Sequence, residues 1–215
     1  MSINNPARLP PRLPPDVLAR VAERGSVRKF PRNTVLIHEG DDSNALFVIV
    51  AGRVKVYLSD SEGREVTLTT QGAGEYFGEM VLDGGPRSAS VITLEPTQCL
   101  VIPHAGLELF LAESPDFSLH LIRDLMRRTR RLTESVRNLA LLDVYGRVAR
   151  VLLELAHDVD GRLVIAERLT QQDIANRVGA SREMVSRILG DLERGGYVHE
   201  ERGQLVIERT PPPHW

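Results

Sequence analysis

The sequence predicts an α+β chain with an N-terminal antiparallel β-roll, a long dimerisation helix and a C-terminal winged helix-turn-helix. Three observations support this class. Short β-rich runs separated by turn formers fill residues 27–103, a stretch without glycine or proline follows at 116–142, and two capped helical segments joined by a glycine come next. We therefore expect one domain at 1–115, the dimerisation helix with a hinge at 116–142, and a second domain at 143–215.

The composition is that of a soluble globular protein. Of the 215 residues, 42% are hydrophobic and 26% are charged, and the net charge is −2. The net charge neither supports nor excludes DNA binding, because a DNA-binding protein needs a local basic face and not a basic average. No apolar run approaches the ~20 residues of a membrane span, and Met1–Pro15 is polar and proline-rich without a secretory core, so we expect a cytoplasmic protein without a membrane partner.

The residues that commonly bind metals are few and dispersed. The single cysteine, Cys99, excludes an internal disulfide, a multi-cysteine zinc site and a cysteine-ligated iron–sulfur cluster. Isolated histidines are usually structural or solvated, so we expect no metal or haem site. Five of the six histidines illustrate this dispersion: His38, His104, His120, His157 and His199.

The N-terminal domain is predicted to open with a short helix at Asp16–Ala22, which follows Pro14-Pro15. Short strands then succeed one another across turns such as Ala51-Gly52. This order is typical of an antiparallel barrel or roll and not of a βαβ fold. The predicted strands are Thr34–Ile37, Ala45–Val50, Arg53–Leu58, Glu65–Leu68, Ser90–Leu94 and Cys99–Ile102.

The segment from Asp116 to Leu142 carries an apolar seam with alternating steps of three and four residues. Such a seam is what one helix presents to a partner helix. It could instead pack against its own domain, but a single seam of about four turns with polar flanks favours a homodimer. The seam residues are Ile122, Leu125, Thr129, Leu132, Val136 and Leu139.

Residues 169–198 have the signature of a helix-turn-helix. Thr170 can cap the first helix, Gly179 supplies a turn with positive φ, and Ser181 can cap the second helix. The segment Gly195–Ile207 then has the pattern of a β-hairpin, which adds a wing. An ordinary helical hairpin with a solvated face is the alternative, and the rest of the chain disfavours it.

The second of these helices is amphipathic. Its apolar side would dock, and its polar side would be free to contact DNA bases. Arginine forks fit guanine O6 and N7, and a carboxylate accepts from cytosine N4. The predicted docking side is Met184, Val185, Ile188, Leu189 and Leu192. The predicted DNA-binding residues are Thr170, Gln171, Ser181, Arg182, Glu183, Ser186 and Arg187.

The stretch Gly72–Ser90 is rich in glycine, but no helix and parallel strand follow it, which excludes a dinucleotide loop. Gly78 would let backbone amides approach a ligand, and a short helix that begins near Glu79 would offer its N–H groups to an anion. Arg87 and Ser88 could close on a phosphate, while Glu79 could accept a proton from a ribose hydroxyl. The alternative is a buried Arg87–Glu79 pair that holds a turn together.

These segments resemble the cyclic AMP receptor protein (CRP/FNR) family over Val17–Ile207. Phe77–Glu79 followed by Pro86–Ala89 is similar to its phosphate-binding cassette. Asn138–Ala149 resembles its hinge and first DNA-domain helix, and Gly179–Leu189 resembles its recognition helix. The resemblance implies a β-roll that binds a cyclic nucleotide, a dimer, and palindromic double-stranded DNA with TGTGA-like half-sites, with RNA polymerase as a further partner.

The resemblance also implies roles for single residues. Glu79 would accept the ribose 2′-OH, Gly78 and Ser88 would bind the phosphate, and Arg87 would pair with it. Arg182, Glu183 and Arg187 would read the half-site. The ligand-binding residues implied by the match are Gly78, Glu79, Met80, Arg87, Ser88, Ala89, Leu132 and Thr133.

The sequence departs from the family pattern at the base-binding position. Family members that respond to cyclic AMP place a Thr-Ser pair against the adenine, whereas this chain has Leu132-Thr133. Leu132 cannot form a hydrogen bond with a purine, and the gap between Glu79 and Arg87 is shorter than in the best-known member. Cyclic AMP is the leading ligand, and cyclic di-GMP is the alternative.

We expect the ligand to act on the DNA-binding domain through the long helix. Binding at Glu79 and Arg87 would reach the helix near Thr133 and shift the hinge at Asn138–Asp143, which would bring two recognition helices to the ~34 Å spacing of one DNA turn. A ligand-independent regulator is a second possibility. An enzyme is disfavoured because the predicted pocket has neither a metal cluster nor a nucleophile–base pair.

Overall fold

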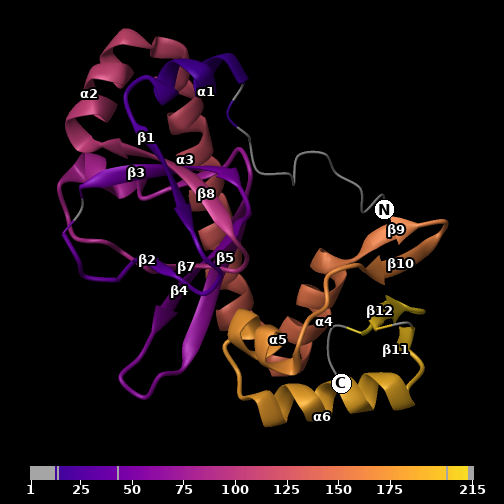
Figure 1. Cartoon of the computed structure of the whole chain (residues 1–215). Coiled ribbons are helices and arrows are strands. Elements are labelled where there is room, and N and C mark those ends of the chain that lie inside the picture. The colour runs from indigo at the N-terminus through magenta and orange to yellow at the C-terminus, as the bar shows by residue number, and fades with distance from the viewer. Residues whose placement is uncertain (1–12, 14, 43, 202, 213–215) are drawn as a thin grey trace. The chain divides into compact units, whose positions relative to one another are not determined.

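The computed structural model describes residues 13, 15–42, 44–201 and 203–212, so most of the proline-rich N-terminal segment and the last three residues lie outside the described part. The chain divides into two compact units, and the boundary lies between Thr129 and Arg130. Helix α3, Pro115–Leu141, contributes to both units (Figure 1). Among the described residues, no helix is long and apolar enough to cross a membrane.

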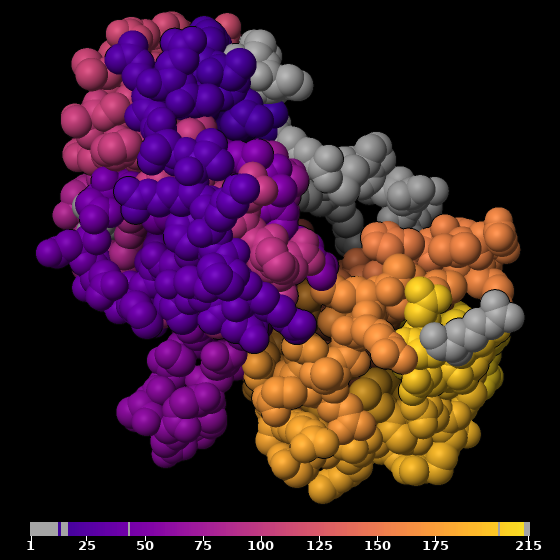
Figure 2. Space-filling model, in the orientation of Figure 1, coloured from indigo at the N-terminus to yellow at the C-terminus, as the bar shows by residue number. Residues whose placement is uncertain are grey.

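The first unit contains two four-stranded antiparallel sheets, which confirms the predicted β-roll. The strand orders are β1-β8-β3-β6 and β2-β7-β4-β5. The hairpin formed by β4 and β5 extends away from the rest of the unit (Figures 1 and 2). The elements are α1 (Pro15–Ala22), β1 (Ser26–Phe30), β2 (Val35–Ile37), β3 (Ala45–Ala51), β4 (Arg53–Ser59), β5 (Glu65–Gly72), β6 (Tyr76–Phe77), the 3₁₀ helix η2 (Glu79–Asp83), β7 (Ser90–Thr93), β8 (Thr97–Pro103) and α2 (His104–Glu113).

Strand β3 lies between two apolar cores. Leu46 and Val48 belong to a core shared with α1, α2 and α3, while Ile49 belongs to a second core built from the strands. This dual burial explains why β3 is a nearly continuous apolar run and not an alternating one. Cys99 lies in the second core, and burial raises the pKa of its thiol to about 12.

Helix α3 has one buried face and one exposed apolar face. Phe117, Leu121 and Asp124 are buried in the first unit. The five aliphatic side chains of the predicted seam are instead exposed, from 38% for Leu125 to 65% for Val136. The domain's own residues therefore leave a large part of the seam uncovered, which favours the partner helix over packing within the domain.

The second unit has the winged helix-turn-helix architecture that the sequence predicts. Thr170 and Asp173 form a reciprocal capping box on α5, Gly179 ends α5 with φ 64°, and the Ser181 side chain caps α6. The sheet order is β11-β12-β10-β9. The elements are α4 (Val144–Leu155), β9 (His157–Val159), β10 (Arg162–Ile165), α5 (Gln171–Val178), α6 (Arg182–Arg194), β11 (Val198–Glu201) and β12 (Gln204–Ile207).

The prediction for one docking residue of α6 is wrong. Val185, Ile188 and Leu192 are buried as predicted, but Met184 is 38% exposed. At about 100° per residue, Met184 lies at the margin of the apolar arc, where its flexible side chain is only partly covered.

Candidate functional site

The predicted phosphate-binding turn contains a glycine that no other residue could replace without strain. Gly78 precedes η2 with φ 79°, in the left-handed region. A Cβ at this position would lie 2.6 Å from Nη1 of Arg87 and 3.1 Å from the carbonyl oxygen of Ala45. The glycine thus allows the Arg87 guanidinium to lie directly against the backbone of the turn.

Arg87 is a buried cation in this turn. Arg87 is only 5% exposed. Its guanidinium donates hydrogen bonds to the carbonyl oxygens of Gly78 at 3.0 Å and Ala45 at 2.8 Å. Burial lowers the pKa of Arg87, and the nearby carboxylates of Glu79 and Asp41 oppose this shift. Within the described part of the chain these bonds use two of its five N–H donors, and no hydrogen bond is formed by the other three.

The other cassette residues lie around the same turn. The Ser88 hydroxyl contacts Sδ of Met80 at 3.1 Å, and both residues are exposed. Ala89 is half-buried beside them. The first unit therefore brings six of the eight predicted ligand residues together. Leu132 and Thr133, the other two, are exposed on the part of α3 that belongs to the second unit.

Glu79 forms its ion pair with Arg128 of α3, a partner that the sequence did not suggest. Its Oε1 lies 3.3 Å from Nη1 of Arg128. The side chains of Glu79 and Arg128 are 14% and 23% exposed, respectively. The alternative of an Arg87–Glu79 pair is therefore not what the structure contains among the residues it describes, although the two charges influence one another.

Arg128 belongs to a buried polar network. It donates from Nε to Asp124 at 2.8 Å and from Nη2 to the carbonyl oxygen of Tyr76 at 2.9 Å, while the Tyr76 hydroxyl donates to Asp124 at 2.7 Å. Burial lowers the pKa of Arg128, but Glu79 and Asp124 outweigh it and the net shift is upward. Burial and the bond to Asp124 raise the pKa of Tyr76 well above its usual range. The network thus connects the predicted phosphate-binding turn directly to the long helix.

A sequence signal for this network does exist. Phe117, Leu121, Asp124 and Arg128 follow one another at steps of four, three and four, which places them on one helix face. An aspartate on an otherwise buried face requires a partner, because a buried unpaired carboxylate is costly. The identity of its partners could not be predicted, since Tyr76 is 48 residues away in the sequence.

The polar side of α6 is exposed, as predicted for a reading helix. Arg182, Glu183, Ser186 and Arg187 are all solvent-accessible. A hydrogen bond from the backbone N–H of Glu183 itself and one from the Ser181 hydroxyl lower the pKa of the Glu183 carboxyl. Glu183 therefore remains an ionised acceptor at neutral pH, the form that can accept from cytosine N4.

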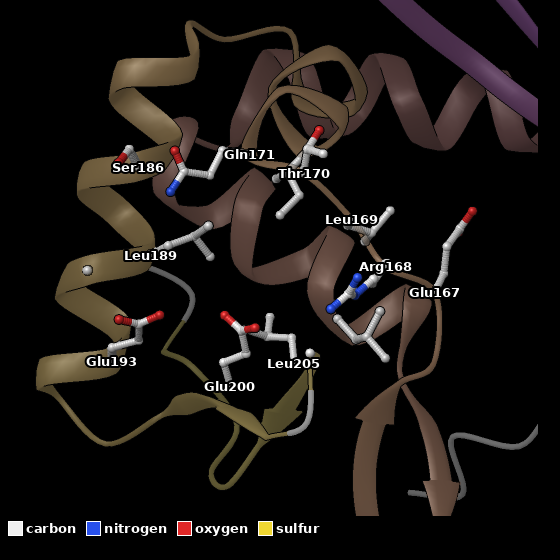
Figure 3. A pocket seen from close by; sticks show the side chains of 14 residues that line it. Glu167, Arg168, Leu169, Thr170, Gln171, Ser186, Leu189, Glu193, Glu200 and Leu205 are labelled. Atoms are coloured by element: carbon white, nitrogen blue, oxygen red, sulfur yellow. The ribbon is translucent and has the colours of Figure 1, made fainter.

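A hollow of about 520 Å³ lies between α5, α6 and the wing (Figure 3). Three of the predicted DNA-binding residues, Thr170, Gln171 and Ser186, line it. Arg168 also lines it, and its guanidinium lies so close to Gly203 that a Cβ there would be 2.7 Å from Nη2. Sequence reasoning missed Arg168 because it precedes the helix-turn-helix signature.

These features together define a class of protein. A β-roll with a buried arginine behind a glycine turn, followed by a winged helix-turn-helix with an exposed polar reading helix, is the architecture of a DNA-binding transcription regulator with a small-molecule sensor domain.

Comparison with known proteins identifies the family. Residues 27–114 match the cyclic nucleotide-binding domain model, and residues 146–211 match the Crp-like helix-turn-helix domain model. The chain is 34% identical over 198 residues, 90% of this chain and 88% of the relative, to the CRP-like cAMP-activated global transcriptional regulator of Mycobacterium tuberculosis (strain CDC 1551 / Oshkosh). The chain belongs to the CRP/FNR family of transcription regulators, which are not enzymes, and its helix-turn-helix is a DNA-binding domain.

Two further relatives bear on the ligand. The cAMP-activated global transcriptional regulator CRP of Haemophilus influenzae is 35% identical over 189 residues, 84% of this chain and 83% of the relative. The solved structure of the c-di-GMP responsive global regulator CLP of Xanthomonas campestris has a TM-score of 0.78 at 26% identity, covering 89% of this chain and 98% of that chain. The family therefore includes relatives with different effectors.

Proposed function

We propose that this protein is a homodimeric transcription regulator that binds cyclic AMP through Gly78, Glu79, Arg87 and Ser88 and responds by changing its affinity for a palindromic operator with TGTGA-like half-sites. The observation that carries the proposal is the buried Arg87 behind Gly78, which keeps donors available for a phosphate. Two relatives named as cAMP-activated regulators support this choice of nucleotide. The sensor would occupy 1–115, the dimer helix and hinge 116–142, and the DNA-binding domain 143–215.

Cyclic di-GMP is a second candidate effector. The relative from Xanthomonas campestris is described as responsive to this dinucleotide. Leu132 stands where the family's cyclic AMP-responsive members have a residue that forms a hydrogen bond with the adenine, which weakens the case for cyclic AMP at the base.

We propose that the signal starts at Glu79. A ribose hydroxyl that donates to Glu79 would change the ion pair with Arg128 and with it the position of α3. A ligand can shift the equilibrium only by binding the DNA-competent arrangement more tightly than the other one. The two reading helices of a dimer would then match successive major grooves, and RNA polymerase would contact the assembled complex.

Fluorescence anisotropy of a labelled palindromic TGTGA-type operator tests this function. Protein is titrated at fixed salt without ligand, with cyclic AMP and with cyclic di-GMP. We expect cyclic AMP to increase the operator affinity at least tenfold. An increase with cyclic di-GMP alone would assign that effector instead, and equal affinity in all three conditions would contradict nucleotide control.

Arg182, at the start of α6, and Arg168, beside the hollow, are expected to have different roles. Arg182→Ala should cost about 1–3 kcal/mol and relax specificity at one base pair per half-site, because it removes a bidentate base contact. Arg168→Ala should weaken all sequences equally and reduce the salt slope by about one per protomer, because we propose that Arg168 contacts a phosphate. Binding of an operator library at several salt concentrations measures both effects, and an equal loss on all sequences for Arg182→Ala would contradict the base contact.

A further inference from the structure

Arg147 forms hydrogen bonds with the ends of two different helices. Its Nε donates to the carbonyl oxygen of Val178 at 2.9 Å, and its Nη1 donates to the carbonyl oxygen of Leu142 at 2.9 Å. Val178 is the last residue of α5, and Leu142 directly follows α3. The final carbonyls of a helix have no partner within it and carry the negative end of its dipole, so a guanidinium is well suited to both.

The connection between α3 and α4 is short, and few side-chain hydrogen bonds are formed there among the described residues. Leu142 and Asp143 alone separate the two helices, and Asp143 caps α4 by accepting a hydrogen bond from the Gly146 N–H at 2.7 Å. This cap fixes where α4 begins, but it does not fix the angle between α4 and α3. The bond from Arg147 to Leu142 supplies that second constraint.

The same arginine reaches the turn of the helix-turn-helix. Val178 immediately precedes Gly179, whose φ of 64° ends α5. Leu139 in the last turn of α3 also lies beside this turn, because its Cδ2 would be 4.0 Å from a Cβ at Gly179. The end of α3 and the turn before α6 are thus linked by the two hydrogen bonds of one guanidinium, with the Leu139 side chain nearby.

We propose that Arg147 is a positioning residue that fixes the helix-turn-helix to the end of α3, so that a movement of α3 is transmitted to the reading helix α6. The role requires a fork, because the two acceptors belong to different helices, and a lysine ammonium is a single point charge. This inference rests on the proposed nucleotide control. It differs from a simple capping role, in which Arg147 would stabilise the domain equally in every state.

Arg147→Gln and Arg147→Lys test the transmission, with Arg150→Gln as a matched control. Arg150 lies on the same helix but pairs with Glu154 on the surface, with both side chains more than 40% exposed. Operator anisotropy gives the ratio of affinities with and without cyclic AMP, and calorimetry gives nucleotide binding. We expect unchanged nucleotide binding but at least a tenfold smaller ratio in both Arg147 variants, and a wild-type ratio in the control.

Two outcomes of this experiment would overturn the proposal. One is a folded Arg147 variant with a wild-type ratio. The other is an equal loss of operator affinity with and without nucleotide, which a merely structural cap predicts. If Arg147→Gln unfolds the domain, the lysine variant decides, because it keeps a cation at the two helix ends.

A distance measurement keeps this inference separate from the nucleotide question. Nitroxide labels on cysteines introduced at the exposed positions Glu134 on α3 and Glu193 on α6 report the distance between these helices within one protomer. Labelled protein is diluted into an excess of unlabelled protein, and the native Cys99 is buried. We expect a broader distance distribution in Arg147→Gln than in wild type, even if no nucleotide affects the operator; an identical distribution would overturn the positioning role alone.

Discussion

Replacing Arg87 with methionine is expected to reduce cyclic-nucleotide affinity by at least about 30-fold, because losing one partner of a buried charged contact costs roughly 2–5 kcal/mol. Methionine fills the space of the aliphatic stem but provides no donor for the phosphate. Isothermal titration calorimetry measures the loss directly. The response of operator affinity to nucleotide should disappear with it, since the ligand can no longer favour one state.

A loss of nucleotide affinity in Arg87→Met reports on the phosphate contact only if the sensor unit of this variant remains folded. Without Arg87, the Ala45 carbonyl oxygen loses this donor, and an unsatisfied buried group costs about 1–3 kcal/mol, whereas the Gly78 carbonyl oxygen still accepts from the Val81 N–H at 3.2 Å. Arg87→Lys keeps the charge but not the fork, so it should lose less affinity than methionine. Arg64→Met makes the same chemical change at a side chain that is 75% exposed, and it should bind nucleotide like wild type. Wild-type affinity in a folded Arg87→Met protein would remove the phosphate assignment.

The local parts of this molecule could be predicted from the sequence. Helix α3 and the caps at Thr170 and Ser181 depend on residues a few positions apart, and the structure confirms these elements. Strand β1 was missed because its first four residues are exposed, so it has no alternating apolar pattern. Strand β6 was missed because it has only two residues.

The partners of the predicted phosphate-binding turn could not be predicted from the sequence. Glu79 and Arg87 were selected from their spacing and chemistry, but Arg128 meets Glu79 from α3, 49 positions later in the chain. Such a contact depends on how the helix packs on the roll, which local periodicity does not encode. The roles of the site residues and the proposed domain boundaries remain predictions that the nucleotide and operator experiments address.

Val136→Glu is expected to dissociate the proposed homodimer. Val136 is 65% exposed and is the fifth of the six seam residues, near the C-terminal end of α3. In a twofold dimer each substitution acts twice, so the complex would lose the burial of two valines, about 1.5 kcal/mol each, and would have to desolvate two carboxylates. Together these terms exceed ~4 kcal/mol, which corresponds to a thousandfold weaker association.

Light scattering coupled to gel filtration measures this change, and Ser135→Glu is the matched control. Ser135 is the adjacent residue, it is exposed, and it gains the same charge, but it lies about 100° away from Val136 on the helix and outside the seam. The control should remain dimeric, whereas Val136→Glu should be monomeric and bind a full operator much more weakly than wild type, because only one reading helix remains.

A dimeric Val136→Glu protein would show that the exposed seam is not the dimer interface. A monomeric wild type would contradict the proposed dimer itself, and α3 would then need another occupant for its apolar face.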